Sequence, residues 1–305
     1  MANRKKTNKK PGKGGRFALG IFTALLLALV ATSSIGFLNA SLLRIRRAEV
    51  VLSDLPGDFD DVTLLYASDI DLCGLNTPAR AGALFHQLQS LEPDILVLGG
   101  DYNAIALLDK LNRPERNSTD ESKALASRSD FFHYISAFHA PLGKYAIAAT
   151  EDLQWQALRT VMEENGIQPL FNSKAEIHNG ADKIWLVGIS GKITSLNDAA
   201  NDFKQGDCVI AITEGPDILP VLLTSEAADS GPWADLALCG HTHGGQIRLF
   251  GRSILSLSDA DKRFLTGWNT GSGIPILTTQ GVGCEGINLR IGTEPEVWLI
   301  TLRKE

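Results

Sequence analysis

Residues 235–248 read Asp-Leu-Ala-Leu-Cys-Gly-His-Thr-His-Gly-Gly-Gln-Ile-Arg, and this stretch decides the fold. The apolar run before the first glycine predicts a buried strand. Side chains two residues apart share a face of an extended chain, so His241 and His243 can direct both imidazoles at one metal ion. Gly244 and Gly245 let the backbone bend tightly and approach whatever lies there. Two surface histidines on a turn are the alternative, which suits an isolated His-x-His better than this longer pattern.

The composition indicates a folded protein that does not bind nucleic acid. Its 305 residues allow one large domain or two smaller ones, and a hydrophobic content of 44% is sufficient for a sizeable core. The formal net charge of -6 argues against nucleic acid as a partner. The four cysteines are scattered and form no Cys-x-x-Cys pair, so they predict neither a disulfide framework nor structural zinc.

The amino-terminal part differs from the rest of the chain. Residues 1–16 are basic and contain no acidic residue, which predicts a disordered tail. Residues 17–38 follow as 22 residues without a charge, long enough to span a bilayer as a helix. A cleavable signal peptide is the alternative, although its apolar region would be shorter. We expect an uncleaved anchor, a linker at 39–50 and one domain at 51–305.

Charges around the apolar segment predict its orientation. Seven Lys or Arg residues precede it and three follow closely, at positions 44, 46 and 47. Basic residues are retained on the cytoplasmic side of a membrane. We therefore expect a single-pass protein of the cell membrane, with a cytoplasmic amino terminus and an extracytoplasmic main domain. The membrane itself is thus one predicted partner.

Apolar strands alternate with helical patterns along the main domain. The stretch 42–55 leads away from the membrane, and 109–130 is expected to be a helix end with a surface excursion. Strands are predicted at 62–68, 94–98, 144–149, 168–171, 175–178, 183–188, 208–213, 236–239, 275–279 and 296–302, and helices at 77–91, 155–165 and 195–203. Such an alternation is typical of layered α/β or α+β folds with helices outside the sheets.

Polar side chains stand just past five of these apolar strands. In sheets of this kind, ligands bind beyond the carboxyl ends of the strands. A single acidic residue after a strand is ordinarily a helix cap or a solvated turn. Five such positions in order favour a ligand site instead. The candidates are Asp69, Asp71, Asp101, Thr150, Glu151, Asp152, Glu214, His241 and His243.

These motifs resemble those of the calcineurin-like metallophosphoesterase superfamily, especially its membrane-anchored bacterial members. The similarity covers roughly residues 50–303 and includes Ser-Asp-Ile-Asp at 68–71, Gly-Gly-Asp at 99–101 and Gly-His-Thr-His-Gly-Gly-Gln at 240–246. The resemblance implies a four-layer α/β/β/α sandwich with a two-metal centre that hydrolyses phosphate esters. It also implies that Asp69 and His243 bind the first metal, that His241 binds the second, and that Asp101 bridges both.

Four positions depart from the family pattern. Asp71 stands where the family has a histidine, and Thr150 where it has a metal-binding asparagine. Glu151, followed by Asp152, replaces the catalytic histidine that protonates the leaving group, and Glu214 replaces a ligand histidine. Carboxylate oxygens suit manganese, magnesium or calcium better than zinc. We therefore expect one or two of these divalent ions.

Two functional hypotheses remain open. The first is a metallophosphoesterase with an altered metal centre, acting on a phosphodiester or pyrophosphate of a cell-envelope, lipid-linked or other small phosphorylated molecule. In it, Asp71 or Glu151 with a raised pKa would serve as the general acid. The second hypothesis is a catalytically silent relative that keeps the fold as a membrane-tethered binding or scaffolding protein. The four retained family residues favour the first, whereas loss of the catalytic histidine and the asparagine favours the second.

Overall fold

The computed structural model describes residues 13–112, 118–148, 154–191, 196, 200–254 and 262–305. Two six-stranded sheets form the centre of the molecule. In spatial order, the first sheet contains β1 (Arg44–Leu52), β14 (Glu296–Lys304), β2 (Thr63–Ala67), β3 (Ile95–Leu98), β4 (Lys144–Ala146) and β5 (Gln168–Pro169). The second contains β12 (Gly267–Asn269), β13 (Ile276–Thr278), β9 (Leu236–Cys239), β8 (Val209–Thr213), β7 (Asp182–Ile189) and β6 (Ser173–Asn179).

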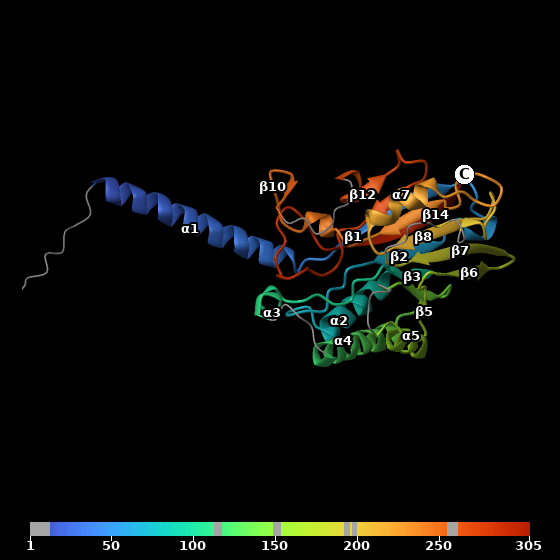
Figure 1. Ribbon diagram of the computed structural model, residues 1–305, viewed down its shortest axis with the longest axis horizontal. Helices are drawn as coiled ribbons and strands as arrows, with labels where there is room; N and C mark the ends of the chain where they lie inside the picture. The colour runs from blue at the N-terminus through green and yellow to red at the C-terminus, as the bar shows by residue number, and fades with distance from the viewer. Residues whose placement is uncertain (1–12, 113–117, 149–153, 192–195, 197–199, 255–261) are drawn as a thin grey trace, which may run out of the picture.

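Helices cover the outer faces of both sheets. The first sheet is covered by α2 (Pro78–Leu88), α4 (Ser118–Ser136) and α5 (Trp155–Glu164), and the second by α7 (Leu219–Thr224). Figure 1 shows these helices on opposite sides of the strands. Shorter elements are α3 (Leu107–Asn112), the β10–β11 hairpin (Arg248–Leu249 and Arg252–Ser253), and 3-10 turns at Gly57–Phe59, Gln89–Leu91, Pro216–Ile218, His243–Gly245 and Lys262–Phe264. The predicted four-layer α/β/β/α sandwich is confirmed.

Strand β2 shows why the layers form. Its side chains alternate between two apolar cores, as the two-residue period of a strand requires. Leu64 and Tyr66 face the core between the two sheets, whereas Leu65 and Ala67 face the core under α2 and α4. A strand buried on both faces reads as a continuous apolar run, which is the pattern found in the sequence.

Helix α2 begins where its sequence predicts. The Thr77 side chain accepts a hydrogen bond from the Arg80 backbone N–H, and Pro78 occupies the first helical position. Both are ordinary features of a helix amino terminus. The helix ends at Leu88 and continues as a 3-10 turn to Leu91, close to the predicted range of 77–91.

Two stretches differ from the sequence-based expectations, and a third is only partly described. The segment 39–50, expected to be a linker, carries most of β1, which pairs in parallel with β14. The excursion expected at 109–130 is largely α4, a helix of 19 residues that packs on α2. Its mixed polar and apolar composition has no strong amphipathic period, so the sequence pattern gave little indication of a helix. Residues 195 and 197–199 of the helix expected at 195–203 lie outside the described residues.

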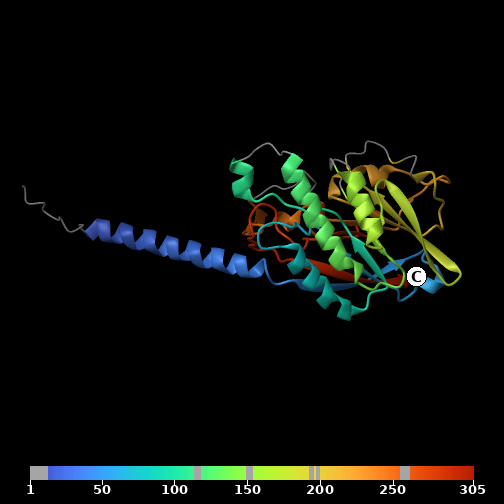
Figure 2. The ribbon, with the colours of Figure 1, turned by 90° about the horizontal axis from the view of Figure 1, so that it is seen from below.

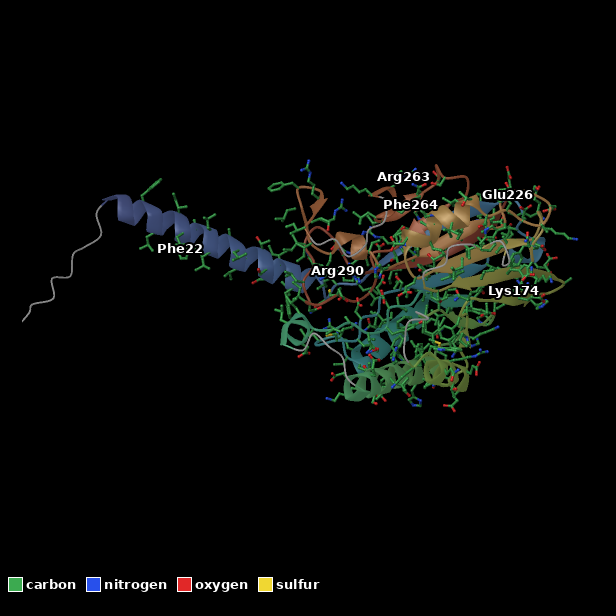
Figure 3. The ribbon with its side chains drawn as sticks, in the orientation of Figure 1. Phe22, Lys174, Glu226, Arg263, Phe264 and Arg290 are labelled. Carbon is green, nitrogen blue, oxygen red and sulfur yellow. The ribbon has the colours of Figure 1, made fainter. Side chains whose placement is uncertain are left out.

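Helix α1 (Lys13–Asn39) extends from the body as a separate arm, as Figures 1 and 2 both show. Its stretch Leu19–Asn39 is long and apolar enough to cross a membrane. Phe22 projects from it into open space (Figure 3). Only the last turn meets the body, where the Arg290 backbone N–H donates to the carbonyl of Gly36.

Strand register places the carboxyl ends of β2 and β3 at the end of the body next to α1. Arg44, at the start of β1, pairs with Glu296 in parallel β14. Strand β2 runs antiparallel to β14, and Tyr66 near its end pairs with Trp298, which is two residues after Glu296 in β14. The residues after β2 therefore lie beside the beginning of β1, and parallel β3 ends on the same side. The candidate active site thus faces the end from which α1 emerges.

Candidate active site

Five predicted ligands have strained backbone conformations. Asp69, Asp71 and Asp101 have φ of 51°, 49° and 48°, and His241 and His243 have φ of 70° and 50°. Residues with a side chain rarely adopt this left-handed region, which costs about 1 to 3 kcal/mol each and clusters at functional sites. The loops after β2 and β3 hold one another there, because the backbone N–H groups of Asp69 and Asp71 donate to the carbonyls of Gly100 and Asp101, each at 3.0 Å.

Asp69 links the two sheets. Its Oδ1 accepts the backbone N–H of His241 at 2.8 Å, and its Oδ2 accepts the Ser68 hydroxyl at 2.6 Å. The side chain is fully buried. Burial, followed by the negative charge of Asp101, raises the pKa of Asp69 to about 7, although its two hydrogen bonds oppose the shift. A cation beside Asp69 would relieve this repulsion.

Asp101 and His241 form a close pair at the more open side of the site. Nδ1 of His241 lies 2.9 Å from Oδ2 of Asp101, and the two side chains are 37% and 29% exposed. The hydrogen bond with Asp101 raises the pKa of His241 to about 9, against the opposing effect of burial. Asp101 thus favours the protonated form of the His241 ring.

Asp71 and His243 form a second pair, which is buried. Nε2 of His243 lies 3.5 Å from Oδ2 of Asp71. Burial and the charges of Asp69 and Asp101 raise the pKa of Asp71 well above its usual range, although Arg290 opposes the shift. Burial lowers the pKa of His243 well below its usual range. Asp71 Oδ2 is also a buried oxygen without a hydrogen-bond partner among the described residues.

Arg290 is a site residue that the sequence analysis missed. It is fully buried, and its guanidinium donates to the carbonyls of Gly281 and Gly283. Its Nη2 also lies 3.3 Å from Nδ1 of His243. Figure 3 shows Arg290 where the body meets α1. In the sequence it is one arginine in an apolar stretch near the carboxyl terminus, and no local motif distinguishes it from a solvated strand residue.

Glycines allow the loops to close around the carboxylates. A Cβ on Gly281, which has φ of 72°, would lie 2.6 Å from Cβ of Asp69. A Cβ on Gly283 would overlap Asp71, and one on Gly240 would overlap Ser68. The segments around Gly240 and Gly281–Gly283 thus approach the site more closely than a side chain would permit.

Of the remaining predicted site residues, the structure describes only Glu214. Glu214 follows β8, where its carbonyl accepts the backbone N–H of Gly240 at 3.2 Å. Its charge contributes to raising the pKa of His241, which places it on the same side of the site. Thr150, Glu151 and Asp152 lie outside the described residues. Their assigned roles remain predictions.

The donor chemistry of the site suits a divalent cation. Asp71 Oδ2 is buried without a hydrogen bond, and Asp69 and Asp71 repel one another, so a positive ion would stabilise both. Carboxylate oxygens and imidazole nitrogens are both common ligands of divalent metal ions. Across the described ranges, however, no three His, Cys, Asp or Glu side chains come together as a metal-binding group. Asp101 contacts His241 instead, and Asp71 lies against His243.

Comparison with known proteins gives three informative relatives. The phosphodiesterase YaeI of Escherichia coli (strain K12) is 30% identical over 219 residues, covering 69% of this chain and 71% of YaeI. The uncharacterized metallophosphoesterase YkoQ of Bacillus subtilis (strain 168) is 22% identical over 245 residues, covering 77% of this chain and 82% of YkoQ.

A vertebrate protein extends the likeness to α1. The transmembrane protein with metallophosphoesterase domain of Danio rerio is 25% identical over 305 residues, covering 94% of this chain and 64% of that longer protein. The present chain thus spans less than two thirds of it. No protein-family model matches the chain.

Proposed function

Because this chain belongs to the calcineurin-like metallophosphoesterase superfamily, we propose that it is a metal-dependent phosphoesterase with an altered metal centre. Its substrate would be a phosphodiester or pyrophosphate, carried by a cell-envelope or lipid-linked molecule. The observation that carries the proposal is that the loops after β2, β3 and β9 meet through direct hydrogen bonds. There Asp69 accepts the His241 backbone N–H, and the His241 ring meets Asp101.

The chain's own residues have distinct tasks in this proposal. Asp69, Asp71, Asp101, Glu214, His241 and His243, with Thr150 from the sequence motif, would hold one or two divalent ions. When bound, such an ion supplies an activated water and stabilises the charge that develops on the phosphate. Manganese, magnesium or calcium is preferred to zinc in view of the carboxylates at positions 71 and 214.

Proton transfer is assigned to acidic side chains. Glu151, beside Asp152, stands where the family has its proton donor, and it would protonate the leaving oxygen. Asp71 is the alternative donor, because its pKa is raised in a buried position, and in that role it would carry a proton instead of holding the metal ion. His241 is assigned to metal binding and not to proton transfer, because its ring must be neutral when it binds a metal ion.

The silent alternative is favoured by one specific observation. Asp101 and His241 satisfy each other, and Arg290 supplies a buried positive charge beside His243. A protein with these contacts has part of the required charge balance without any metal ion. It would bind a phosphorylated ligand without hydrolysing it.

Metal binding and turnover test the two candidates together. Full-length protein, freed of metal in detergent micelles, would be titrated with MnCl2 by calorimetry and assayed with a generic aryl phosphodiester. We expect binding and hydrolysis, both lost in the double variant His241→Ala/His243→Ala. His178→Ala is the matched control, because His178 is an exposed β6 residue paired with Glu176. Binding without turnover on generic or lipid phosphates would favour the silent alternative, and manganese binding that survives the double change would place the ion elsewhere.

Membrane topology belongs to the same proposal. The α1 stretch would remain as a single span, with the amino terminus in the cytoplasm and the main domain outside. The basic excess before the span and its apolar length support this. Protease accessibility in spheroplasts tests it. Digestion of the main domain from outside is expected, whereas protection in the cytoplasm or a mature chain lacking the span would refute it.

A further inference from the structure

The β10–β11 hairpin carries an aromatic side chain at its tip. Leu249 pairs with Arg252, so Phe250 and Gly251 form a two-residue turn with φ of 52° and 78°. Turns with both central residues at positive φ favour Asn or Gly, and a bulky residue there is strained. Phe250 is nevertheless fully exposed. Packing within the described body therefore gives no reason for this costly choice.

The hairpin is attached next to the end of α1. The Arg248 backbone N–H donates to the carbonyl of Ile291 at 2.7 Å, and the neighbouring Arg290 N–H donates to the carbonyl of Gly36 in the last turns of α1. Figure 1 accordingly shows β10 at the end of the body from which α1 emerges. If α1 crosses a bilayer, the lipid surface lies at this end.

Other exposed apolar side chains occur at the same end. Leu249 and Ile254 belong to the hairpin and its continuation, and are 42% and 60% exposed. Leu107 and Leu111 of α3 are 43% and 71% exposed. Helix α3 is held there by the Leu107 N–H, which donates to the carbonyl of Gly286 in the loop between β13 and β14. Figures 1 and 2 both show α3 at the end of the body from which α1 emerges, and Figure 2 shows it set off to one side of α1. Scattered exposed leucines need no explanation, but a gathering at one end indicates an interaction surface.

The charge of the hairpin suits an anionic lipid surface. Arg248 and Arg252 flank the tip, and residues 240–254 contain no acidic side chain. Aromatic and basic residues together favour the headgroup boundary of a bilayer. By contrast, the β6–β7 hairpin at the opposite end of the body turns through Asn179, Gly180, Ala181 and Asp182, without a large apolar side chain.

We propose that the β10–β11 hairpin, aided by α3, docks on the bilayer that α1 crosses, with Phe250 inserted at the headgroup boundary. The body would then be held by two attachments, the anchor and the hairpin, instead of swinging on the anchor alone. The carboxyl ends of β2 and β3 face this same end, so Asp69 and Asp101 would stand over the lipid headgroups. A phosphate ester in a lipid headgroup is the matching substrate class. The docking rests on the proposed membrane span of α1, and only this substrate class rests on the proposed hydrolysis.

Bromine quenching of an added tryptophan tests the docking directly. The full chain would be reconstituted in phosphatidylcholine and phosphatidylglycerol vesicles, with and without brominated acyl chains. Phe250→Trp should add a blue-shifted emission, above that of the five native tryptophans, that brominated lipid quenches. Ala181→Trp, at the exposed tip of the opposite hairpin, is the matched control and should keep its emission. Arg252→Glu should weaken quenching of Phe250→Trp as phosphatidylglycerol is increased.

The result does not depend on hydrolysis. Ile254→Trp provides a second position on the same surface should the turn not tolerate tryptophan. Quenching by brominated lipid at Phe250→Trp or Ile254→Trp, without quenching at Ala181→Trp, supports the docking. This holds even if the chain proves catalytically silent. Emission at both positions that is as insensitive to bromine as that of Ala181→Trp would overturn the docking and leave the proposed function untouched.

Discussion

Nη2 of Arg290 lies 3.3 Å from Nδ1 of His243, and this contact determines which ring nitrogen carries the proton. A guanidinium has only donors, so Nδ1 must accept. The proton of the neutral imidazole then lies on Nε2, which is directed at Asp71 Oδ2 at 3.5 Å. The buried His243 ring thus lies between the guanidinium of Arg290 and the carboxyl group of Asp71. Selective 15N-histidine labelling of the metal-free protein would show His243 as the Nε2–H tautomer.

Loss of the Arg290 side chain should destabilise the protein strongly. Arg290→Met removes the guanidinium that donates to the buried carbonyl of Gly283, and it leaves the carbonyl of Gly281 with the Glu296 backbone N–H. We expect the free energy of unfolding to fall by about 3 kcal/mol. Urea denaturation of the full chain in micelles measures this. Arg159→Met is the control, because Arg159 forms a surface pair with Glu163 and should cost no more than about 1 kcal/mol. Similar losses in the two variants would contradict the structural role of Arg290.

Two glycines separate backbone strain from steric crowding at the site. Gly206 has φ of 92°, and no atom lies within 4 Å of a Cβ built there. Gly206→Ala should therefore lower the free energy of unfolding by only about 1 kcal/mol, for the left-handed backbone alone. Gly281 has φ of 72°, and a Cβ built there would also lie 2.6 Å from Cβ of Asp69. Gly281→Ala should therefore lower the free energy of unfolding by about 1 to 3 kcal/mol more than the backbone strain alone. The measurement is again urea denaturation. Equal costs would show that the loop around Asp69 has room to move.

Asp235 predicts a pH dependence that is separate from the candidate active site. Burial, and secondarily the charge of Asp54, raises the pKa of Asp235 to about 6, while the Val209 N–H opposes the shift. The folded state then binds this proton more tightly than the unfolded state. The contribution to stability is greatest below the ordinary pKa near 3.8 and declines as pH rises to about 6.

Asp235→Asn removes this decline while keeping an acceptor for the Val209 N–H. The variant should gain about 1 to 2 kcal/mol at pH 7 relative to the natural protein, with no gain at pH 4. Chemical denaturation at the two pH values measures the difference. A loss of stability at pH 7 would mean that the ionised carboxylate is needed in the fold.

The sequence pattern predicted the residues at the strand ends better than the residues that pack around them. Asp69, Asp101 and His241 were predictable because each follows a short apolar run, and parallel strands bring such ends together. Arg290 was not, because its role depends on carbonyls in a loop that only the tertiary fold brings beside His243. Strand β1 was missed because its exposed arginines hide the period of an edge strand. Phe250 gave no signal, since its importance lies in exposure and backbone conformation.

Asp101 should be essential both for metal binding and for the raised pKa of His241. Asp101→Ala removes the acceptor that raises the pKa of His241, and we expect manganese-dependent hydrolysis to disappear. Calorimetric titration with MnCl2 should show binding weakened at least tenfold, equivalent to about 1.4 kcal/mol. Asp130→Ala on the exposed face of α4 is the control and should change neither. Chelation with EDTA should abolish the natural protein's activity, and manganese should restore it. Activity that survives both EDTA and Asp101→Ala would exclude a metal-dependent reaction at this site.

Glu151 decides whether the altered centre is a weak enzyme or a silent one. An ordinary glutamic acid is mostly ionised at neutral pH, so few molecules have the proton that the leaving oxygen needs. The hydrolysis rate should therefore be low and should increase toward acid pH. Glu151→Gln should reduce it strongly, because the amide cannot supply the proton. Glu151→His should raise the rate near neutral pH by restoring a donor with a pKa close to 6.5. The measurement is hydrolysis of an aryl phosphodiester with manganese from acid to neutral pH. If the protein binds manganese yet remains inactive, even when Glu151→His is combined with Thr150→Asn, the silent binding function is the correct one.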